Sequence, residues 1–164
     1  MEITGEKIIL KPYTLERCHE FYKEYVSDPA MTYEPYVYNQ EKVDSYYQNK
    51  VVDTKRRFFA ICLHNKVIGE IQLKRIDFKE LCGTMSIVLL NDTVKGKGFG
   101  TEAERLLIMY AIEELELHTI YADVVHRNVR SKHILEKLGF KHLYDDDILA
   151  YYRYDNGSEK GNSN

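Results

Sequence analysis

The feature that most constrains the fold is a pair of strand-like segments separated by only three residues. RRFFAICL (residues 56–63) and VIGEIQLKRI (67–76) are rich in β-branched and aromatic residues, and only HNK lies between them. A connection this short joins antiparallel neighbours, because a parallel crossover needs a dozen or more residues. The chain therefore does not fit a doubly wound, all-parallel sheet.

Strand and helix patterns continue along the rest of the chain. Five further segments read as strands: residues 7–13, 82–91, 118–125, 140–144 and 148–154. Helical spacing predicts four helices: residues 15–26, 40–52, 99–116 and 129–138. Thr14, Asn39 and Asn128 stand at helix-capping positions, and Gly139 is placed to end the last helix in the left-handed conformation. This order predicts an α+β fold: a mixed, mostly antiparallel seven-stranded sheet with flanking helices and a central βαβ unit.

Length and composition narrow the class of protein. We expect a single domain over residues 1–154 and a polar, disordered tail over residues 155–164. A net charge of −3 argues against a nucleic-acid partner, and the lack of a long apolar run or a signal-peptide pattern argues against a membrane. Cys18, Cys62 and Cys82 are too scattered for a zinc site and too few for a disulfide framework, which indicates reduced thiols, no metal and a cytoplasmic location.

A glycine-rich, cationic loop runs directly into a helical pattern in NDTVKGKGFGTEAERLL, residues 91–107. The N–H groups of such a turn form a concave anion site, and the positive end of the following helix adds to it. Gly98 and Gly100 would let phosphate oxygens approach the main chain, while Lys95 and Lys97 add charge. A plain glycine-rich loop with solvated lysines is the simpler alternative, and the spacing alone does not decide between them.

Three kinds of phosphate site compete for this loop. A nucleoside-triphosphate loop needs Ser or Thr after Gly-Lys, but Gly98 follows Lys97. A dinucleotide site has a suitably spaced acid in Asp123, but Thr101 occupies the third glycine position and the hairpin breaks the required strand order. The third ligand is coenzyme A, which carries a diphosphate and a 3′-phosphate.

Three segments resemble the GNAT superfamily of N-acetyltransferases. VKGKGFGTEA (94–103) is similar to the R/Q-x-x-G-x-G/A signature, with Lys95 in the Arg/Gln place. NVRSKHILEKLGF (128–140) and VIGEIQLKRID (67–77) resemble the second signature and the central hairpin. The combination looks most like the branch of ribosomal-protein N-terminal acetyltransferases, and the resemblance covers residues 6–154.

The resemblance implies transfer of an acetyl group from acetyl-CoA to a primary amine by direct attack on the thioester. The acceptor would be a small molecule or a peptide such as a protein N-terminus. Homodimers occur in the family, so the resemblance also allows a homodimer. Two segments would hold the cofactor, one along its pantetheine arm and one around its diphosphate. Carried over to this chain, they are Val88, Leu89 and Leu90, then Lys95, Gly96, Lys97, Gly98, Phe99, Gly100 and Thr101. Asn128 and Ser131 would contact the cofactor from the last helix.

Amine acetylation needs a base, an oxyanion donor and a proton for the departing sulfur. The family's usual oxyanion donor is a backbone N–H near Leu90, and Asn128 matches the motif asparagine that contacts the cofactor arm or an active-site water. Glu70 lies on the strand beside the expected crevice and is a candidate base; the alternative is a charge on a solvent-facing strand side. His126 and Glu34 are further candidates. Leu135 stands where many relatives have the tyrosine that protonates the thiolate.

The acceptor pocket of the family lies at the connection of the first two helices, here MTYEPYVYN. Tyr33, Tyr36 and Tyr38 would line it with rings and hydroxyls, and Glu34 would attract an ammonium group. Tyrosines that cover the core are the alternative. The acidic run at residues 145–147 could attract a cation, although such runs are commonly solvated.

Two other functions are alternatives for a chain with this sequence. A nicotinamide-dependent oxidoreductase requires a parallel sheet, which the hairpin contradicts. A non-catalytic, CoA-binding regulatory protein would explain the missing tyrosine.

Overall fold

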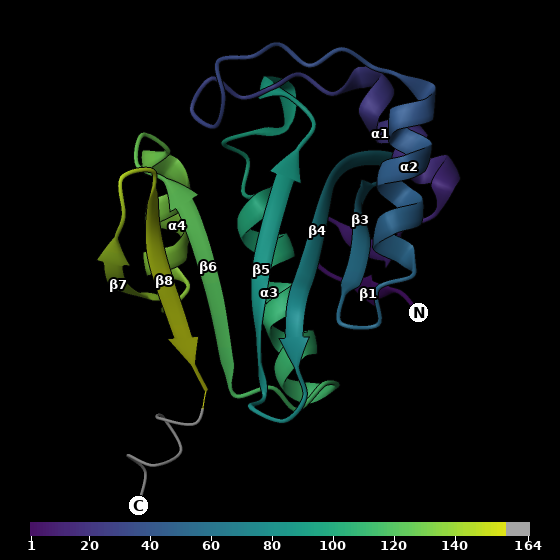
Figure 1. The fold of residues 1–164 in the computed structure, drawn as a ribbon. Helices are drawn as coiled ribbons and strands as arrows, with labels where there is room; N and C mark the ends of the chain where they lie inside the picture. The colour runs from purple at the N-terminus through teal and green to yellow at the C-terminus, as the bar shows by residue number, and fades with distance from the viewer. Residues whose placement is uncertain (157–164) are drawn as a thin grey trace, which may run out of the picture.

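The computed structural model describes residues 1–156, which form one mixed sheet of eight strands in the order β1-β2-β3-β4-β5-β6-β8-β7 (Figure 1). The strands are β1 (Ile3–Thr4), β2 (Ile9–Pro12), β3 (Arg57–Leu63), β4 (Lys66–Asp77), β5 (Cys82–Leu89), β6 (Thr119–Val125), β7 (Lys141–Asp145) and β8 (Leu149–Asp155). The predicted α+β class is confirmed, but the predicted number of seven strands is one too low. The additional strand, β1, is two residues long, which is too short to produce an alternating sequence pattern.

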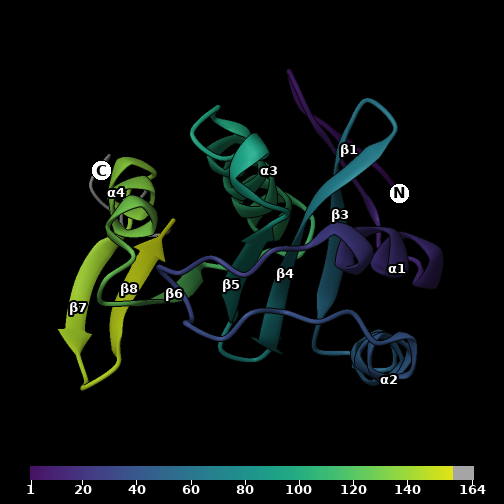
Figure 2. The same ribbon diagram turned by 90° about the horizontal axis from the view of Figure 1, so that it is seen from above.

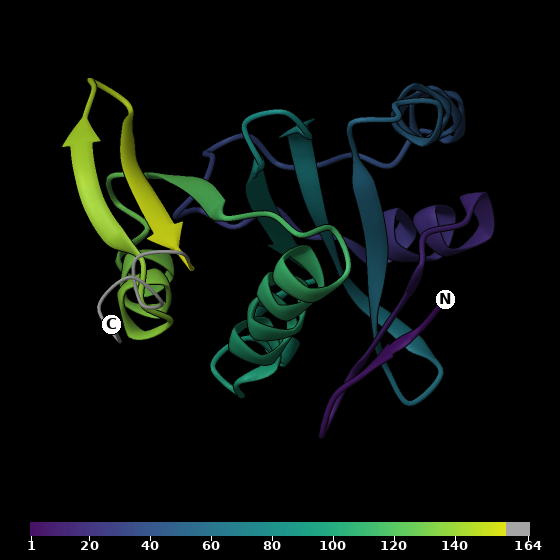
Figure 3. The same cartoon turned by 90° about the horizontal axis from the view of Figure 1, so that it is seen from below.

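Helices cover both faces of the sheet. They are α1 (Leu15–Glu24), α2 (Gln40–Val51), α3 (Phe99–Glu113) and α4 (Val129–Lys137), with a short 3₁₀ helix η1 (Asp92–Val94) before α3. Figure 3 shows α3 and α4 on one side of the sheet and α2 on the other. Neighbouring residues of β3 point to opposite faces: the Phe59 ring contacts Tyr110 of α3, and the Phe58 ring contacts Tyr46 of α2.

The predicted helix caps are confirmed. Thr14 Oγ1 accepts a hydrogen bond from Arg17 N at 3.2 Å, and Asn39 Oδ1 accepts one from Lys42 N at 2.9 Å. Gly139 has φ +101°, and Phe140 N donates to Leu135 O at 2.9 Å, which closes the end of α4. These signals are local, so the sequence alone was sufficient to place them.

The central βαβ unit consists of β5, α3 and β6. Its two strands pair in parallel only between Cys82–Thr84 and Thr119–Tyr121. Beyond these residues the strands diverge toward the top of Figure 1. β5 keeps its antiparallel pairing with β4, and β6 keeps its pairing with β8, so the sheet opens between its two halves.

The connection between α1 and α2 passes over the open ends of β5 and β6 (Figure 2). Three contacts hold its first part: Val26 N donates to Leu90 O, Lys95 pairs with Asp28, and Arg127 Nε donates to Pro29 O at 3.0 Å. The connection is therefore tied both to the end of β5 and to the turn after β6.

The predicted start of the tail, at residue 155, is wrong. Asp155, predicted to begin the tail, is the last residue of β8 and pairs with Thr119, and Asn156 N donates to His118 O at 2.9 Å. The rest of the predicted tail, residues 157–164, lies outside the described residues. Within residues 1–156, none of the helices combines the length and the apolar character needed to cross a bilayer.

Candidate functional site

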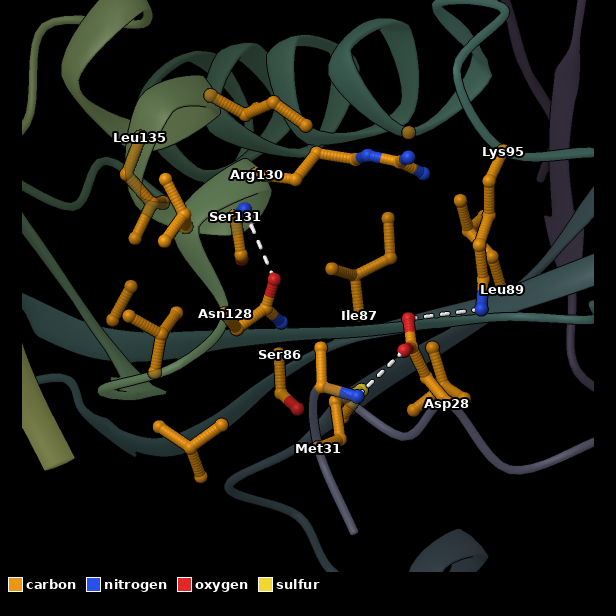
Figure 4. A pocket seen from close by; sticks show the side chains of 18 of the residues that line it. Asp28, Met31, Ser86, Ile87, Leu89, Lys95, Asn128, Arg130, Ser131 and Leu135 are labelled. Carbon is orange, nitrogen blue, oxygen red and sulfur yellow. Dashed lines mark hydrogen bonds and ion pairs between the residues drawn. The ribbon is translucent and has the colours of Figure 1, made fainter. Parts of the chain in front are cut away.

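A cavity of about 480 Å³ lies where β5 and β6 diverge (Figure 4). Its walls are the two strands, the first turns of α3 and α4, and the start of the α1–α2 connection. The lining includes residues 85–89, 122–125, 127–131, Tyr25, Asp28, Ala30, Met31, Asp92, Lys95, Gly100, Glu104, Ile134, Leu135 and Leu149.

The free edge of β5 along this cavity is formed by alternate residues. Leu90 N donates to Ile68 O at 2.8 Å, on the side of β4, whereas Leu81 O accepts from Thr119 N, on the side of β6. Because hydrogen-bonding groups alternate along a strand, Ile87 and Leu89 direct their N–H and C=O groups toward the opening. Val88 pairs with Glu70, so the N–H and C=O groups of Val88 point toward β4.

This alternation corrects the expected role of Leu90. Its N–H is bonded to Ile68 O, its carbonyl accepts from Val26 N, and its side chain is fully buried. Leu90 therefore has no free main-chain group to offer as an oxyanion donor, and it does not line the cavity. Ile87 was missed because parity along a strand depends on the register of pairing, which the sequence pattern did not specify.

The glycine-rich turn connects two residues of the lining, Lys95 and Gly100. Gly96 and Gly98 have φ values of +72° and +86°, and a Cβ at either position would meet nothing within 4 Å. Gly98 caps α3 without a side chain, so the first N–H groups of that helix have no side-chain cap there. Phe99 and Thr101 are half-buried, Lys97 is exposed, and none of these three lines the cavity.

Lys95 is not a free cation. Its Nζ lies 2.9 Å from Asp28 Oδ2 and 3.4 Å from Asp92 Oδ1, and its side chain is 11% exposed. Figure 4 shows Arg130 extending from α4 across the cavity toward the side where Lys95 lies. Arg130 is exposed and was not identified from the sequence, because its direction depends on how α4 packs.

Asn128 and Ser131 come together at the start of α4, and both line the cavity. Asn128 Oδ1 accepts a hydrogen bond from Ser131 N at 3.1 Å, so the predicted cap of α4 is confirmed. Leu135 also lines the cavity and is buried. A different tyrosine, Tyr25, contributes to the lining.

Glu70 lies beside the cavity, on the face of the sheet that α1 and α2 cover. It is 2% exposed, so the alternative of a solvent-facing charge is wrong. Its Oε1 accepts hydrogen bonds from the hydroxyls of Tyr22 (2.6 Å) and Tyr46 (2.7 Å), while Oε2 is buried without a hydrogen-bond partner among the described residues. Burial raises the pKa of Glu70, and the hydrogen bonds from the two tyrosines oppose that shift. Tyr22 packs against Tyr25 of the cavity lining, with ring centroids 5.6 Å apart.

The residues predicted to bind the acceptor do not gather at one point. Tyr33 is 80% exposed and stacks on the Arg127 guanidinium at 4.1 Å, and Glu34 is exposed. Tyr36 packs against Tyr22 and Tyr25. None of the three lines the cavity; Asp28, Ala30 and Met31 of the same connection do.

The other charged candidates have structural partners. His126 Nε2 lies 2.7 Å from Asp146 O. Asp146 Oδ1 accepts from the N–H groups of Ile148 and Leu149, and Asp145 pairs with His142. The acidic run therefore shapes the β7–β8 turn.

Glu104 is a site residue that the sequence pattern did not reveal. It lies one turn after Gly100 on α3, lines the cavity and is only 4% exposed. Its Oε2 has no hydrogen-bond partner among the described residues. Burial raises the pKa of Glu104 to about 8, so the carboxyl group is mainly neutral near pH 7.

Comparison with known families identifies the family of this chain. Residues 7–141 match the family model described as the acetyltransferase (GNAT) domain. This chain belongs to the GNAT acetyltransferase family. The resemblance found in the sequence motifs is thereby confirmed at the level of the superfamily.

Several known proteins are similar to this GNAT chain. The probable N-acetyltransferase YjcK of Bacillus subtilis is 36% identical over 106 residues, which are 63% of this chain and 59% of YjcK. Spermidine N(1)-acetyltransferase of Escherichia coli is 31% identical over 107 residues, 65% of this chain and 56% of that protein. Both matches thus span somewhat more than half the length of the relative. Among solved structures, this chain is similar to RimL, a ribosomal alpha-N-protein acetyltransferase in complex with coenzyme A, with a TM-score of 0.82 and 12% sequence identity. The match covers 94% of this chain and 98% of the RimL chain.

The fold of this GNAT chain also excludes the alternative of a nicotinamide-dependent oxidoreductase. β3 and β4 pair antiparallel, as the HNK connection predicted, and β5–β6 is the single parallel pair in the described sheet. A dinucleotide-binding half needs consecutive parallel strands.

Proposed function

We propose that the protein transfers an acetyl group from acetyl-CoA to a primary amine. The observation that carries the proposal is the opening beside β5: a strand edge with free main-chain groups at Ile87 and Leu89 leads to a glycine turn at the start of α3. An extended arm with amide groups can pair with such an edge, and a diphosphate suits the helix start.

The residues present fit coenzyme A. Gly96, Gly98 and the first turn of α3 would hold the diphosphate through N–H groups, because no side chain obstructs them. Arg130 would add a cation from the opposite wall. When bound, acetyl-CoA supplies the acetyl group as an activated thioester. Ile87 and Leu89 would orient its arm, and Asn128 would contact it from α4.

Glu70 is the base that we assign to the site. A primary amine arrives as an ammonium group and must lose a proton before it can attack. The raised pKa of Glu70 makes its carboxylate a stronger base than an exposed one. Tyr22 donates to Glu70 and contacts Tyr25 of the lining, so we propose that the proton passes from the cavity to Glu70 by way of the Tyr22 hydroxyl.

Tyr25 is the group that we assign as proton donor. Leu135 has no proton to give, whereas Tyr25 lines the same cavity. Burial raises the pKa of the Tyr25 hydroxyl, which therefore stays protonated at neutral pH.

The acceptor would enter on the side of the α1–α2 connection, where Asp28, Ala30 and Met31 form the wall. Both a small-molecule amine and a peptide N-terminus are compatible with this opening, and the relatives named above include a spermidine acetyltransferase and a ribosomal-protein acetyltransferase. The test is thiol release from acetyl-CoA with spermidine, single amino acids and short peptides with free N-termini. Acceptor-dependent release supports the proposal. Binding of CoA without release for any amine would identify a non-catalytic CoA-binding protein instead.

A further inference from the structure

We propose that Glu104 is a cofactor-binding residue that, as a neutral carboxylic acid, hydrogen-bonds to an amide of the pantetheine arm, so that the acyl donor binds less tightly at alkaline pH. This inference rests on the proposed use of acetyl-CoA. It assigns a role to a buried polar group that the proposed reaction leaves unused.

The position of Glu104 supports this role. Glu104 and Gly100 lie one turn apart on α3 and both line the cavity. A Cβ placed on Gly100 would lie 3.4 Å from Leu89 Cδ1 and 3.8 Å from Ile87 Cδ1. This side of α3 therefore faces the part of β5 whose main-chain edge is free.

The unpaired, buried oxygen of Glu104 is evidence that this side chain binds a ligand. A buried carboxyl oxygen without a partner costs free energy, and folded proteins rarely retain one unless a ligand or a water satisfies it. Oε2 is completely buried and has no partner among the described residues. Because the Glu104 side chain lines the cavity, a turn of its carboxyl group would bring this oxygen to a ligand group that carries both an N–H and a C=O.

An amide is the chemical complement of a neutral carboxylic acid. The acid donates through its O–H and accepts through its C=O, and an amide does the same through N–H and C=O, so the two can form a pair of hydrogen bonds. The pantetheine arm carries two amides. An ionised Glu104 would lose the donor and would place a negative charge one turn from the expected diphosphate site.

Other charged groups also line this cavity. They are the carboxylates of Asp28, Asp92 and Asp123 and the cations of Lys95, Arg127 and Arg130, and the hydroxyl of Tyr25 is a further titratable group of the lining. Lys95 is already paired with Asp28 and Asp92. Loss of the Glu104 proton therefore adds a negative charge to a cavity that would hold a polyanionic ligand.

Calorimetric titration with two probes tests the proposal. S-acetonyl-CoA, a thioether without a titrating thiol, carries the pantetheine arm; adenosine 3′,5′-bisphosphate lacks it. The variants are Glu104→Gln, which stays neutral, and Glu104→Leu, which makes no hydrogen bond. Glu113→Gln, an exposed change on the same helix, is the matched control.

For the wild type and Glu113→Gln we expect the affinity for S-acetonyl-CoA to fall about tenfold between roughly pH 7 and pH 9. Glu104→Gln should show no such fall. Glu104→Leu should bind S-acetonyl-CoA about tenfold more weakly than the wild type near pH 7. Adenosine 3′,5′-bisphosphate should bind all the variants alike near pH 7.

The outcomes separate the two proposals. If the wild type does not bind S-acetonyl-CoA, the proposed function fails and this inference fails with it. If the wild type binds and Glu104→Leu matches it near pH 7, the role of Glu104 is refuted while the function stands. If Glu104→Leu does not fold, Glu104→Gln decides: a pH profile equal to that of the wild type overturns the inference, and a flat profile supports it.

Discussion

Asp28 and Lys95, 67 residues apart in the sequence, form an ion pair with 2.9 Å between Oδ2 and Nζ. The pair links the start of the α1–α2 connection to the turn before α3. Burial works to raise the pKa of Asp28, but the hydrogen bond from Lys95 and the N–H of Ala30 hold it below its usual value. The lysine in the signature position thus also fastens the α1–α2 connection, which forms one wall of the cavity.

We expect Asp28→Asn to lower the free energy of unfolding by about 1–2 kcal/mol, because Lys95 is largely buried and would lose its closest anion. Urea unfolding monitored by circular dichroism measures the loss. Asp92→Asn is the matched control: Asp92 is the second partner of Lys95, but its side chain is 96% exposed. We expect that change to stay within about 0.5 kcal/mol. Equal losses in the two variants would show that Asp28 has no special part in fastening the connection.

Gly98→Asp should weaken CoA binding at least about tenfold relative to Gly98→Asn, because the two side chains differ by one negative charge beside the expected diphosphate. Both residues tolerate the positive φ of Gly98 better than most residues, and a Cβ there meets nothing within 4 Å. Gly98→Asn places a side chain of nearly the same size in the same backbone conformation, so a loss of stability shared by both variants does not explain a difference in binding. Titration calorimetry compares the variants, and equal affinities would contradict the placement of the diphosphate.

Asn128→Ala should cost about 1 kcal/mol of stability, because α4 loses its cap. Asn128→Ser keeps a capping oxygen but withdraws the amide from the cavity. If Asn128 also positions the ligand, Asn128→Ser should lower acetyl transfer by roughly tenfold with little change in stability. Stability and turnover are measured on the same samples. If Asn128→Ser keeps the turnover of the wild type, Asn128 acts only as a helix cap.

Local chemistry explains why much of the fold was predictable. The caps at Thr14, Asn39 and Asn128 and the end of α4 at Gly139 depend on a few neighbouring residues, and the structure has each of them. The antiparallel hairpin followed from a three-residue connection, which leaves few other arrangements.

The cavity was less predictable, because its features depend on tertiary packing. Strand register decides whether Ile87 and Leu89, or instead Leu90, present free main-chain groups to the cavity. A shift of one residue would turn each of these groups to the other side of the strand. The partner of Lys95 comes from a distant loop. Glu104 reads as part of a polar helix face in TEAER, and its burial arises only because α3 packs over the diverging strands.

Glu104→Gln should stabilise the protein increasingly as the pH rises from about 4.5 to about 8. The ordinary pKa of this group is 4.5, and in the folded protein it is about 8. Between these values the unfolded chain releases the proton and the folded chain keeps it, so the wild type loses up to about 1.4 kcal/mol of stability per pH unit through this group. Below about pH 4.5 the wild type and the variant should be equally stable. Urea unfolding at several pH values measures the difference, with Glu113→Gln as the exposed control. A constant difference between Glu104→Gln and the wild type would refute the raised pKa.

Glu70→Gln should lower acetyl transfer by about a hundredfold or more, because an amide of the same shape cannot accept the proton of the ammonium group. Donor binding, measured by calorimetry, should be unchanged, since Glu70 does not line the cavity.

Tyr22→Phe and Tyr46→Phe then separate a proton path from simple support of Glu70. Each change removes one hydrogen bond to the same oxygen, at 2.6 and 2.7 Å, so both should destabilise the protein by a similar amount, about 1–2 kcal/mol. Of the two, Tyr22 contacts Tyr25 of the cavity lining. We therefore expect Tyr22→Phe to reduce turnover about tenfold and Tyr46→Phe to reduce it less than about threefold. If both variants lose turnover equally, the tyrosines only hold Glu70 in place; if Glu70→Gln retains wild-type turnover, the base must be sought elsewhere in the cavity.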